Sequence, residues 1–289
     1  MRSVLLEIST KSFTRCTSYL ASCAAVVYIS EKICIRRVAM DFVGLTMNEG
    51  IARITLCRGK VNAINETVVD ELTDCFRKLS YDPGVRAVIF TGEGKFFTFG
   101  FDIPEFLGYS KEAFVRYLTK FTGLYTDIFL YPKPVIAALN GHTIAGGCML
   151  AIACDWRIMV QGSAKISLNE INFSSSVFTG SVEMMKLWLG QRKAENALLS
   201  GAMYSPEEAR ELGLIDQIVS KDDLDSEAGK KAREYASQDS AAFTSIKKLL
   251  RKPAAEEMMK RERESILEFV DIWYSENTWN NLKEKVIRS

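Results

Sequence analysis

The chain has 289 residues, of which 47% are hydrophobic and 25% are charged, as in ordinary soluble globular proteins. Its 37 basic and 36 acidic residues give a formal net charge of +1, so no global charge favours a nucleic-acid or membrane partner. This length allows one large domain or two small ones, with a complete core that needs no disulfide or metal.

Residues 1–40 differ from the rest because they are rich in arginine, lysine and serine and contain only two acidic residues, Glu7 and Glu31. Such a start is typical of an organellar transit peptide. The uncharged run 16–30 is too short to span a bilayer. Two interpretations stay open: a targeting segment, or an extension upstream of a domain that starts near Met40 or Met47. We expect this segment to be poorly ordered. The expected location is cytoplasmic, or the mitochondrial matrix if residues 1–40 are a transit peptide.

From residue 41 onward, strand and helix patterns alternate, which predicts an α/β fold. Short apolar runs rich in β-branched residues predict strands, and apolar residues at helical spacing predict helices. The predicted strands are 50–57, 85–90, 134–139 and 156–160. The predicted helices are 65–80, 111–130 and one that begins at 146–153. We expect a core domain over 41–225.

The last third, from about residue 179, is predicted to be mostly helical, with a C-terminal helical region over 226–289. A capping box at Ser205–Glu208 with proline at the first helical position predicts a helix start, and Gly213 is a good terminator. Residues 254–273 form one long amphipathic pattern. This helix could be an oligomer contact or a solvated helix packed on its own domain.

The seven cysteines are odd in number and include no CxxC pair, which argues against a disulfide framework and a zinc site and favours reduced intracellular thiols. The one histidine, His142, excludes a histidine-rich metal centre. A Ser-His-Asp triad could be built only around it. No metal site is predicted.

Two glycine-containing loops suggest a catalytic feature. In GEGKFFTFGFDI (92–103), Gly100 permits a tight turn that leaves the Phe101 amide pointing outward. In NGHTIAGGCM (140–149), glycines at 146 and 147 open an apolar helix and present free amides at its positive end. Alone, the first loop could be a plain surface turn, and the second could be a close helix–strand crossing that needs small residues. Together they predict an oxyanion hole, in which two backbone amides bind one carbonyl oxygen.

Four ordered motifs between about residues 45 and 219 resemble the crotonase (enoyl-CoA hydratase/isomerase) superfamily. They are VNAIN (61–65), FTFGFDI (97–103), NGHTIAGGCMLAIACDWRI (140–158) and SPEEARELGLIDQIV (205–219). The resemblance implies a spiral of ββα turns, a helical C-terminal region that makes homotrimers or hexamers, and an acyl-CoA thioester as substrate. It places the oxyanion hole at the Phe101 and Gly146 amides and implies that the Asn62–Asn65 turn and the 99–103 loop line the CoA path.

One departure from the family pattern decides the expected reaction. Hydratases of this family carry one glutamate three residues after the oxyanion glycine and a second further along. Here Met149 occupies the first position, whereas Glu170, after Asn169, matches the second. Hydration needs a positioned water, which two carboxylates activate naturally. Shifting a 3-enoyl double bond to the 2-position needs no water. We therefore expect a single-base Δ3-Δ2-enoyl-CoA isomerase of the fatty-acid β-oxidation type, with Glu170 as proton shuttle and a pKa raised by burial.

The remaining assignments concern the substrate path. The residues expected to contact substrate are Ala63, Phe99, Gly100, Asp102, Ile103, Met149 and Asn169. Asn169 could equally be a turn former, and Asp102 is expected to be a turn or cap residue rather than an acid. His142 is expected to be structural. Several phenylalanines suggest a bulky acyl pocket, although core packing explains them almost as well: Phe97, Phe99, Phe101, Phe106 and Phe178.

Three alternatives stay open. One is another single-base reaction, such as thioester hydrolysis, decarboxylation or a hydratase-like activity. Another is a non-catalytic crotonase-fold binding protein, and the third is an RNA-binding relative. We expect no cofactor beyond the CoA of the substrate, no nucleic-acid partner and no membrane partner. Acyl chain length and type are not determined by the sequence.

Overall fold

The structure, a computed structural model, describes residues 27–28, 34–35 and 40–287. The expectation of a poorly ordered segment over 1–40 therefore lies almost entirely outside the described residues. Two short strands within it, β1 (Val27–Tyr28) and β2 (Cys34–Ile35), pair in antiparallel fashion. None of the described helices is long and apolar enough to cross a bilayer.

A six-stranded sheet forms the first layer, in the order β11-β9-β7-β5-β4-β3. It begins with an antiparallel hairpin of β3 (Val43–Asn48) and β4 (Ile51–Leu56). The other strands, which follow in parallel, are β5 (Ala87–Gly92), β7 (Val135–Leu139), β9 (Trp156–Val160) and β11 (Gln217–Val219). All five residues of β7 are buried, as expected for a parallel strand covered on both faces.

A second, three-stranded parallel sheet has the order β10-β8-β6. Its strands are β6 (Phe96–Thr98), β8 (His142–Ile144) and β10 (Ile166–Ser167). Each follows directly on a strand of the large sheet and is itself followed by a helix, so the chain winds through successive ββα turns. The expected spiral is confirmed.

Neighbouring turns of the spiral are joined at a tight corner. A side chain at Gly141 would place its Cβ 1.9 Å from the carbonyl oxygen of Lys95, so only glycine fits between β7 and β8. The Asn140 amide donates to the carbonyls of Gly94 and Phe96 at 3.2 and 3.0 Å. The Asn-Gly pair therefore fixes one turn of the spiral against the previous one.

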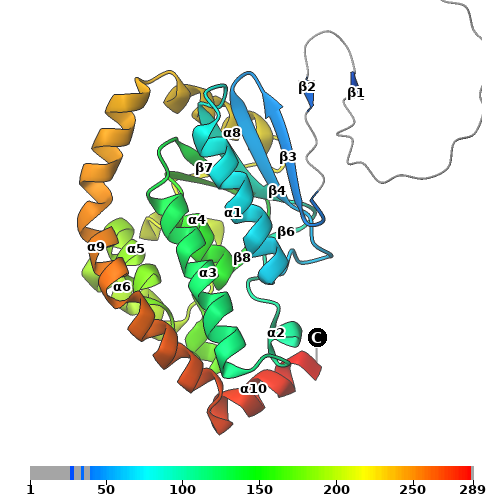
Figure 1. The fold of residues 1–289 in the computed structure, drawn as a ribbon, viewed down its shortest axis with the longest axis vertical. Coiled ribbons are helices and arrows are strands. Elements are labelled where there is room, and N and C mark those ends of the chain that lie inside the picture. The colour runs from blue at the N-terminus through cyan, green and yellow to red at the C-terminus, as the bar shows by residue number, and fades with distance from the viewer. Residues whose placement is uncertain (1–26, 29–33, 36–39, 288–289) are drawn as a thin grey trace, which may run out of the picture.

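Helices surround the two sheets (Figure 1). Those of the spiral are α1 (Glu66–Tyr81), α2 (Ile103–Phe106), α3 (Lys111–Phe129), α4 (Gly146–Ala153), the 3-10 helix η1 (Glu170–Phe173) and α5 (Thr179–Leu189). The later ones are α6 (Gln191–Ser200), α7 (Pro206–Leu212), α8 (Leu224–Ala236), α9 (Ser240–Trp273) and α10 (Glu276–Ile287). Figure 1 shows α9 running along one side of the molecule and α10 turning back beneath α2 and α3.

Most predicted elements are confirmed, including the capping box at Ser205 and the left-handed C-cap at Gly213. Two boundaries were wrong. The strand expected at 85–90 starts at Ala87, because Val85 still belongs to the turn that follows α1 and donates its N–H to Asp82. The helix expected at 254–273 begins at Ser240, where Asp239 caps it.

Pro253 lies inside α9 and was expected to precede the helix. Proline removes the hydrogen bond to the carbonyl four residues earlier. That residue, Leu249, is 71% exposed, so water can take the place of the missing donor. The helix therefore continues through the proline.

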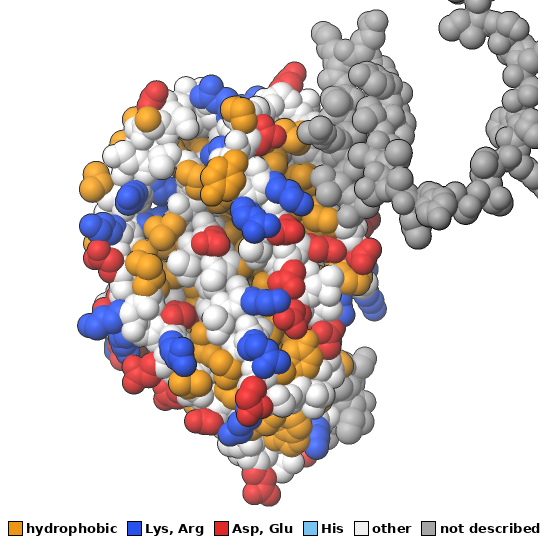
Figure 2. Space-filling view, viewed as in Figure 1, with side chains coloured by type: hydrophobic (Ala, Val, Ile, Leu, Met, Phe, Trp, Pro, Cys, Tyr) orange, Lys and Arg blue, Asp and Glu red, His pale blue; other side chains and the backbone are white. Residues whose placement is uncertain are grey.

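Basic and acidic side chains are interspersed over the face shown in Figure 2, with apolar side chains between them. This distribution agrees with the net charge of +1. Among the exposed apolar side chains, several belong to α9: Ile246, Leu249, Leu250, Met259 and Leu267. The division into 41–225 and 226–289 stays a prediction.

Candidate active site

The two glycine loops singled out in the sequence meet in space. Gly100 has a φ of +92°, and a Cβ there would lie 2.9 Å from the Ile144 carbonyl oxygen and 3.1 Å from the Ala145 Cβ. A Cβ on Gly146 would lie 2.9 Å from a ring carbon of Phe101. Both positions need glycine because the loops are in contact. The structure thus brings the Phe101 segment against the start of α4.

Within the described part of the chain, the backbone N–H groups of Phe101 and Gly146 lie outside the regular hydrogen-bond pattern. Ile64 N–H donates to Gly100 O at 2.8 Å, and Asp102 N–H donates to Ile64 O at 3.1 Å, so the bridge between these segments does not use Phe101 N–H. Gly146 is the first residue of α4, where an amide has no acceptor within the helix. Its neighbour Ala145 has a φ of +51° and provides no side-chain cap. This geometry suits two donors aimed at one oxygen.

Glu170 lies beside these loops. Ala145 N–H donates to Ser167 O at 2.8 Å, which ties the start of α4 to β10, and η1 begins three residues later with Glu170. Burial raises the pKa of Cys148, two residues after Gly146, and the charge of Glu170 raises it further. The expected base is therefore adjacent to the helix that supplies the Gly146 amide.

The carboxylate of Glu170 is deeply buried, since the residue is only 8% exposed. Neither of its oxygens has a hydrogen-bond partner among the described residues. Burial penalises the charged form and raises the pKa of Glu170 to about 8. No neighbouring charge within the described chain is a cause of this shift. A buried carboxyl with a pKa near the working pH is suited to accept and return a proton.

The segment around Glu170 is held in an unusual conformation. Asn169 is the residue before η1, and its buried side-chain oxygen has no partner in the described part of the chain. Ser174 closes η1 with a left-handed φ of +57°. Its carbonyl accepts from Thr278 and its hydroxyl from Asn281, both on α10. The C-terminal helix therefore fixes the turn that follows Glu170.

Met149 lies on α4 with its side chain fully buried. Asp102 caps α2 by accepting from Glu105 N–H at 3.2 Å, which confirms the capping role expected for it. Ile103 begins the same helix. Ala63 is half-buried and Phe99 is 48% exposed, so both lie at the surface end of the loops.

His142 and most of the phenylalanines have structural surroundings. His142 Nδ1 accepts from Lys165 N–H at 3.2 Å, and burial lowers the pKa of its ring. Phe97, Phe106 and Phe178 are fully buried in the core. Of the five expected in an acyl pocket, these three fit core packing, and Phe101 packs edge-on against Phe121 with ring centroids 4.8 Å apart.

Two residues organise the loops of the site through contacts that the sequence did not indicate. Asn62 has a φ of +51°. Its side-chain amide donates to the carbonyls of Glu93, Phe96 and Phe97 and so fastens the β5–β6 loop together with the start of β6. Arg58 pairs with Asp102 and Glu105. The only sequence feature of Arg58 is its place directly after a buried strand.

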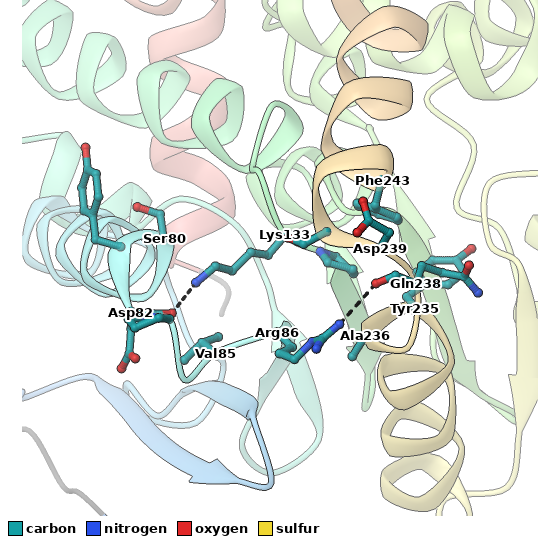
Figure 3. A pocket seen from close by; sticks show the side chains of 14 residues that line it. Ser80, Asp82, Val85, Arg86, Lys133, Tyr235, Ala236, Gln238, Asp239 and Phe243 are labelled. Carbon is teal, nitrogen blue, oxygen red and sulfur yellow. Dashed lines mark hydrogen bonds between the residues drawn. The ribbon is translucent and has the colours of Figure 1, made fainter.

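A surface cleft of about 380 Å³ lies between the end of α1 and the α8–α9 junction and contains none of the candidate site residues (Figure 3). Its cations are used in holding the fold together. Lys133 Nζ donates to the carbonyls of Leu79 and Asp82, both at 2.6 Å, and Arg86 donates to Gln238 O at 3.2 Å. This cleft is therefore not part of the candidate active site. Within the described residues, no cluster of three or more His, Cys, Asp or Glu is placed to hold a metal ion.

The spiral fold and the two-loop site define an enzyme of the crotonase superfamily. Residues 46–275 match the family described as enoyl-CoA hydratase/isomerase, and the chain belongs to that family. The family implies an acyl-CoA thioester as substrate.

Some of the similar proteins are named as hydratases and others as isomerases. A probable enoyl-CoA hydratase of Bacillus subtilis is 31% identical over 214 residues, which covers 73% of this chain and 82% of the relative. Enoyl-CoA delta isomerase 1, mitochondrial, of Mus musculus is 29% identical over 222 residues, 76% of this chain and 77% of the relative. The crystal structure of human mitochondrial delta3-delta2-enoyl-CoA isomerase superposes with a TM-score of 0.82 at 25% identity, covering 86% of this chain and 98% of that one.

Proposed function

We propose that this enzyme is a Δ3-Δ2-enoyl-CoA isomerase in which Glu170 is the single acid–base residue. The observation that carries the proposal is the isolation of Glu170, a buried carboxyl whose raised pKa has burial, and no neighbouring charge in the described chain, as its cause. Met149, at the position of the hydratases' first glutamate, is apolar and fully buried. The named isomerases among the similar proteins support the same reaction.

The reaction needs one proton to move between two carbons. The Glu170 carboxylate takes a proton from C2 of a 3-enoyl-CoA, and the C–H electron pair becomes the C1–C2 double bond of a dienolate. Its negative charge lies on the thioester oxygen, which accepts from the Phe101 and Gly146 amides. The protonated Glu170 then donates its proton to C4, where the C3–C4 π pair forms the new C4–H bond. The C1–C2 π pair becomes the C2–C3 double bond, and an oxygen lone pair re-forms the thioester carbonyl.

The oxyanion hole supplies electrostatic stabilisation at that oxygen. Its Gly146 donor stands at the positive end of α4, where the helix dipole favours negative charge. Removing one donor from such a hole typically costs about 3 kcal/mol of transition-state stabilisation. In this proposal Ala63, Phe99, Gly100, Asp102 and Ile103 line the CoA path, and Asn169 and Met149 border the acyl group. CoA enters as part of the substrate, with no separate cofactor.

The direct test is the Glu170→Gln variant, which keeps the shape of the side chain and removes the base. We expect isomerisation of trans-3-hexenoyl-CoA to fall by about a thousandfold or more, whereas the affinity for saturated hexanoyl-CoA changes by less than about threefold. The product is followed as trans-2-hexenoyl-CoA. Turnover close to that of the wild type would overturn the assignment of Glu170.

Hydration is the second candidate, because hydratases are also among the similar proteins. It is tested by following the 3-hydroxyacyl product from trans-2-hexenoyl-CoA, with free CoA release as the readout for hydrolysis. We expect isomerisation to exceed both. Faster hydration than isomerisation in the wild type would replace the proposed reaction.

Met149→Glu tests whether Met149 is the reason for the weak hydration that we expect. The variant restores the second carboxylate of a hydratase, so we expect hydration to rise and isomerisation to fall. Met149→Gln, which has similar volume and no charge, is the matched control and should lose isomerisation without gaining hydration. An equal gain of hydration in both variants would show that the carboxylate is not the missing element.

We also propose a homotrimer or hexamer, supported by the exposed apolar side chains of α9, such as Ile246, Leu249 and Leu250. Native mass spectrometry measures this directly, and a monomer at micromolar concentration would contradict it. The neutral net charge supports the absence of a nucleic-acid partner, for which a salt-dependent RNA shift assay is the test.

A further inference from the structure

Arg58 joins the two loops that flank the Phe101 amide. It lies two residues after the end of β4, and its side chain is 21% exposed. Its Nη1 lies 2.6 Å from Asp102 Oδ2 and also donates to Ala63 O at 3.2 Å. Its Nη2 lies 3.4 Å from Glu105 Oε2. One guanidinium group therefore spans the 61–65 turn, the 99–103 loop and α2.

The backbone that Arg58 holds is the backbone that orients the Phe101 amide. Ile64, in the turn, bonds on both sides of Phe101, accepting from Asp102 N–H and donating to Gly100 O. Asp102 is thus fixed twice, by its amide to Ile64 and by its carboxylate to Arg58. A displacement of Asp102 turns the neighbouring Phe101 peptide with it.

A second set of contacts makes this frame rigid. Glu105 Oε2 also accepts from Asn65 Nδ2 at 3.0 Å, and Glu105 Oε1 accepts from Tyr109 at 3.1 Å. The Arg58 guanidinium lies over the Phe42 ring, 5.4 Å from its centroid. Partly exposed ion pairs contribute little to stability. The value of this network therefore lies in geometry rather than in holding the fold together.

We propose that Arg58 is a positioning residue of this enzyme, which acts through Asp102 to aim the Phe101 N–H at the thioester oxygen. This inference rests on the proposed function, because it requires a thioester in the oxyanion hole. A donor misplaced by about 1 Å can lower a rate about a hundredfold. The planar fork of arginine is needed because lysine cannot reach Asp102, Ala63 and Glu105 together.

The test compares Arg58→Met with Arg53→Met. Arg53 lies on β4, five residues before Arg58. Its side chain is 27% exposed and pairs with Asp225 at 3.0 Å, away from the loops. The readout specific to the oxyanion hole is the infrared carbonyl band of butyryl-CoA carrying ¹³C at the thioester carbon. This saturated ester cannot isomerise, and hydrogen bonds to its carbonyl oxygen lower the stretching frequency.

For Arg58→Met we expect kcat for 3-hexenoyl-CoA to fall by about 10- to 100-fold, and the bound carbonyl band to move back toward its frequency in solution. The dissociation constant of butyryl-CoA should change by less than about threefold. Arg53→Met should leave all three values as in the wild type. Asp102→Asn, which keeps an oxygen to cap α2 but removes the charge, should shift the band in the same direction and provides the measurement if Arg58→Met does not fold.

An unchanged band in both Arg58→Met and Asp102→Asn would overturn the positioning role, whatever the loss of activity. A band shift of the same size in Arg53→Met would overturn it as well, since the effect would then be a general loosening. If the wild-type enzyme lowers the carbonyl frequency of bound butyryl-CoA but does not isomerise 3-hexenoyl-CoA, the proposed reaction is refuted. The positioning role of Arg58 is then still supported by the band shift.

Discussion

In the proposed mechanism, the carboxyl of Glu170 makes the rate depend on pH in a predictable direction. Only the ionised form can take the C2 proton, and burial raises the pKa of Glu170 to about 8 in the free enzyme. Because kcat/KM reports the free enzyme, it should rise about tenfold per pH unit below 8 and level off above that value.

This profile is measured with trans-3-hexenoyl-CoA and with a longer 3-enoyl-CoA. The apparent pKa should be the same for both substrates if it belongs to Glu170. An ascending limb near pH 4 to 5 would mean that Glu170 is hydrated in the active enzyme or is not the base.

The same burial has a consequence for stability. Between its ordinary pKa and about 8, Glu170 holds a proton in the folded protein that it releases on unfolding. The free energy of unfolding of the wild type should therefore decrease as pH rises from 5 to 8. Glu170→Gln removes this titration and should be the more stable protein above pH 8, by on the order of 4 kcal/mol.

Urea unfolding at pH 5, 7 and 9 checks this prediction. The exposed Glu264→Gln is the control and should differ little from the wild type at each pH. A Glu170→Gln variant that is equally destabilised at all three values would show that the carboxyl is solvated in the folded state.

At the scale of elements, the contact between the 99–103 loop and α4 predicts the effect of a single methyl group. Gly146→Ala places a Cβ 2.9 Å from the Phe101 ring. The ring must move, and the two amides separate. We expect kcat to fall by about a hundredfold or more, as when one oxyanion donor is lost. Gly123→Ala on the neighbouring helix α3, where a Cβ meets no atom within 4 Å, is the control and should keep full activity. Equal activity of the two variants would contradict the oxyanion assignment.

The sequence predicted best those elements that are long enough for apolar residues to recur at a regular spacing. The helices α1 and α3 have 16 and 19 residues, and their apolar stripes were visible. The second sheet was not predicted, because β6, β8 and β10 have only three, three and two residues, too few to alternate. The loops of the candidate site follow these short strands, which therefore fix where the loops lie.

The same limit applies to the site. The candidate donors and base could be proposed from glycine spacing and from the family pattern. The partners of Arg58 could not, since Asp102 lies 44 positions further along the chain and is brought near by the fold. The pairing of α10 with Ser174 is another long-range contact that no local pattern indicates.

For the whole molecule, a buried ion cluster docks α9 onto the spiral. Asp155, after α4, accepts from Lys247 and Arg251 of α9, each at 2.8 Å, and all three side chains are at most 7% exposed. Asp155→Ala leaves two buried cations without their partner and should lower the free energy of unfolding by about 3 to 5 kcal/mol.

Asp271→Ala is the matched control. Asp271 also lies on α9 and pairs with Lys111 of α3 at 3.0 Å, but its side chain is 76% exposed. It should cost less than about 1 kcal/mol. Urea unfolding of both variants gives the comparison, and similar losses would mean that α9 is not anchored at Asp155.

The last helices also reach back to the segment behind Glu170. Thr278 and Asn281 hold Ser174, and on α9 Ser265 and Glu262 accept from the amides of Thr179 and Gly180 at 3.1 and 2.8 Å. Both ends of the segment between η1 and α5 are thus held by residues that lie about a hundred positions further along the chain. Because a ribosome releases the chain from its N-terminus, a nascent chain that ends before α9 carries Glu170 on an unfastened loop. The contacts that fix the segment behind Glu170 therefore form only after nearly all of the chain has been made.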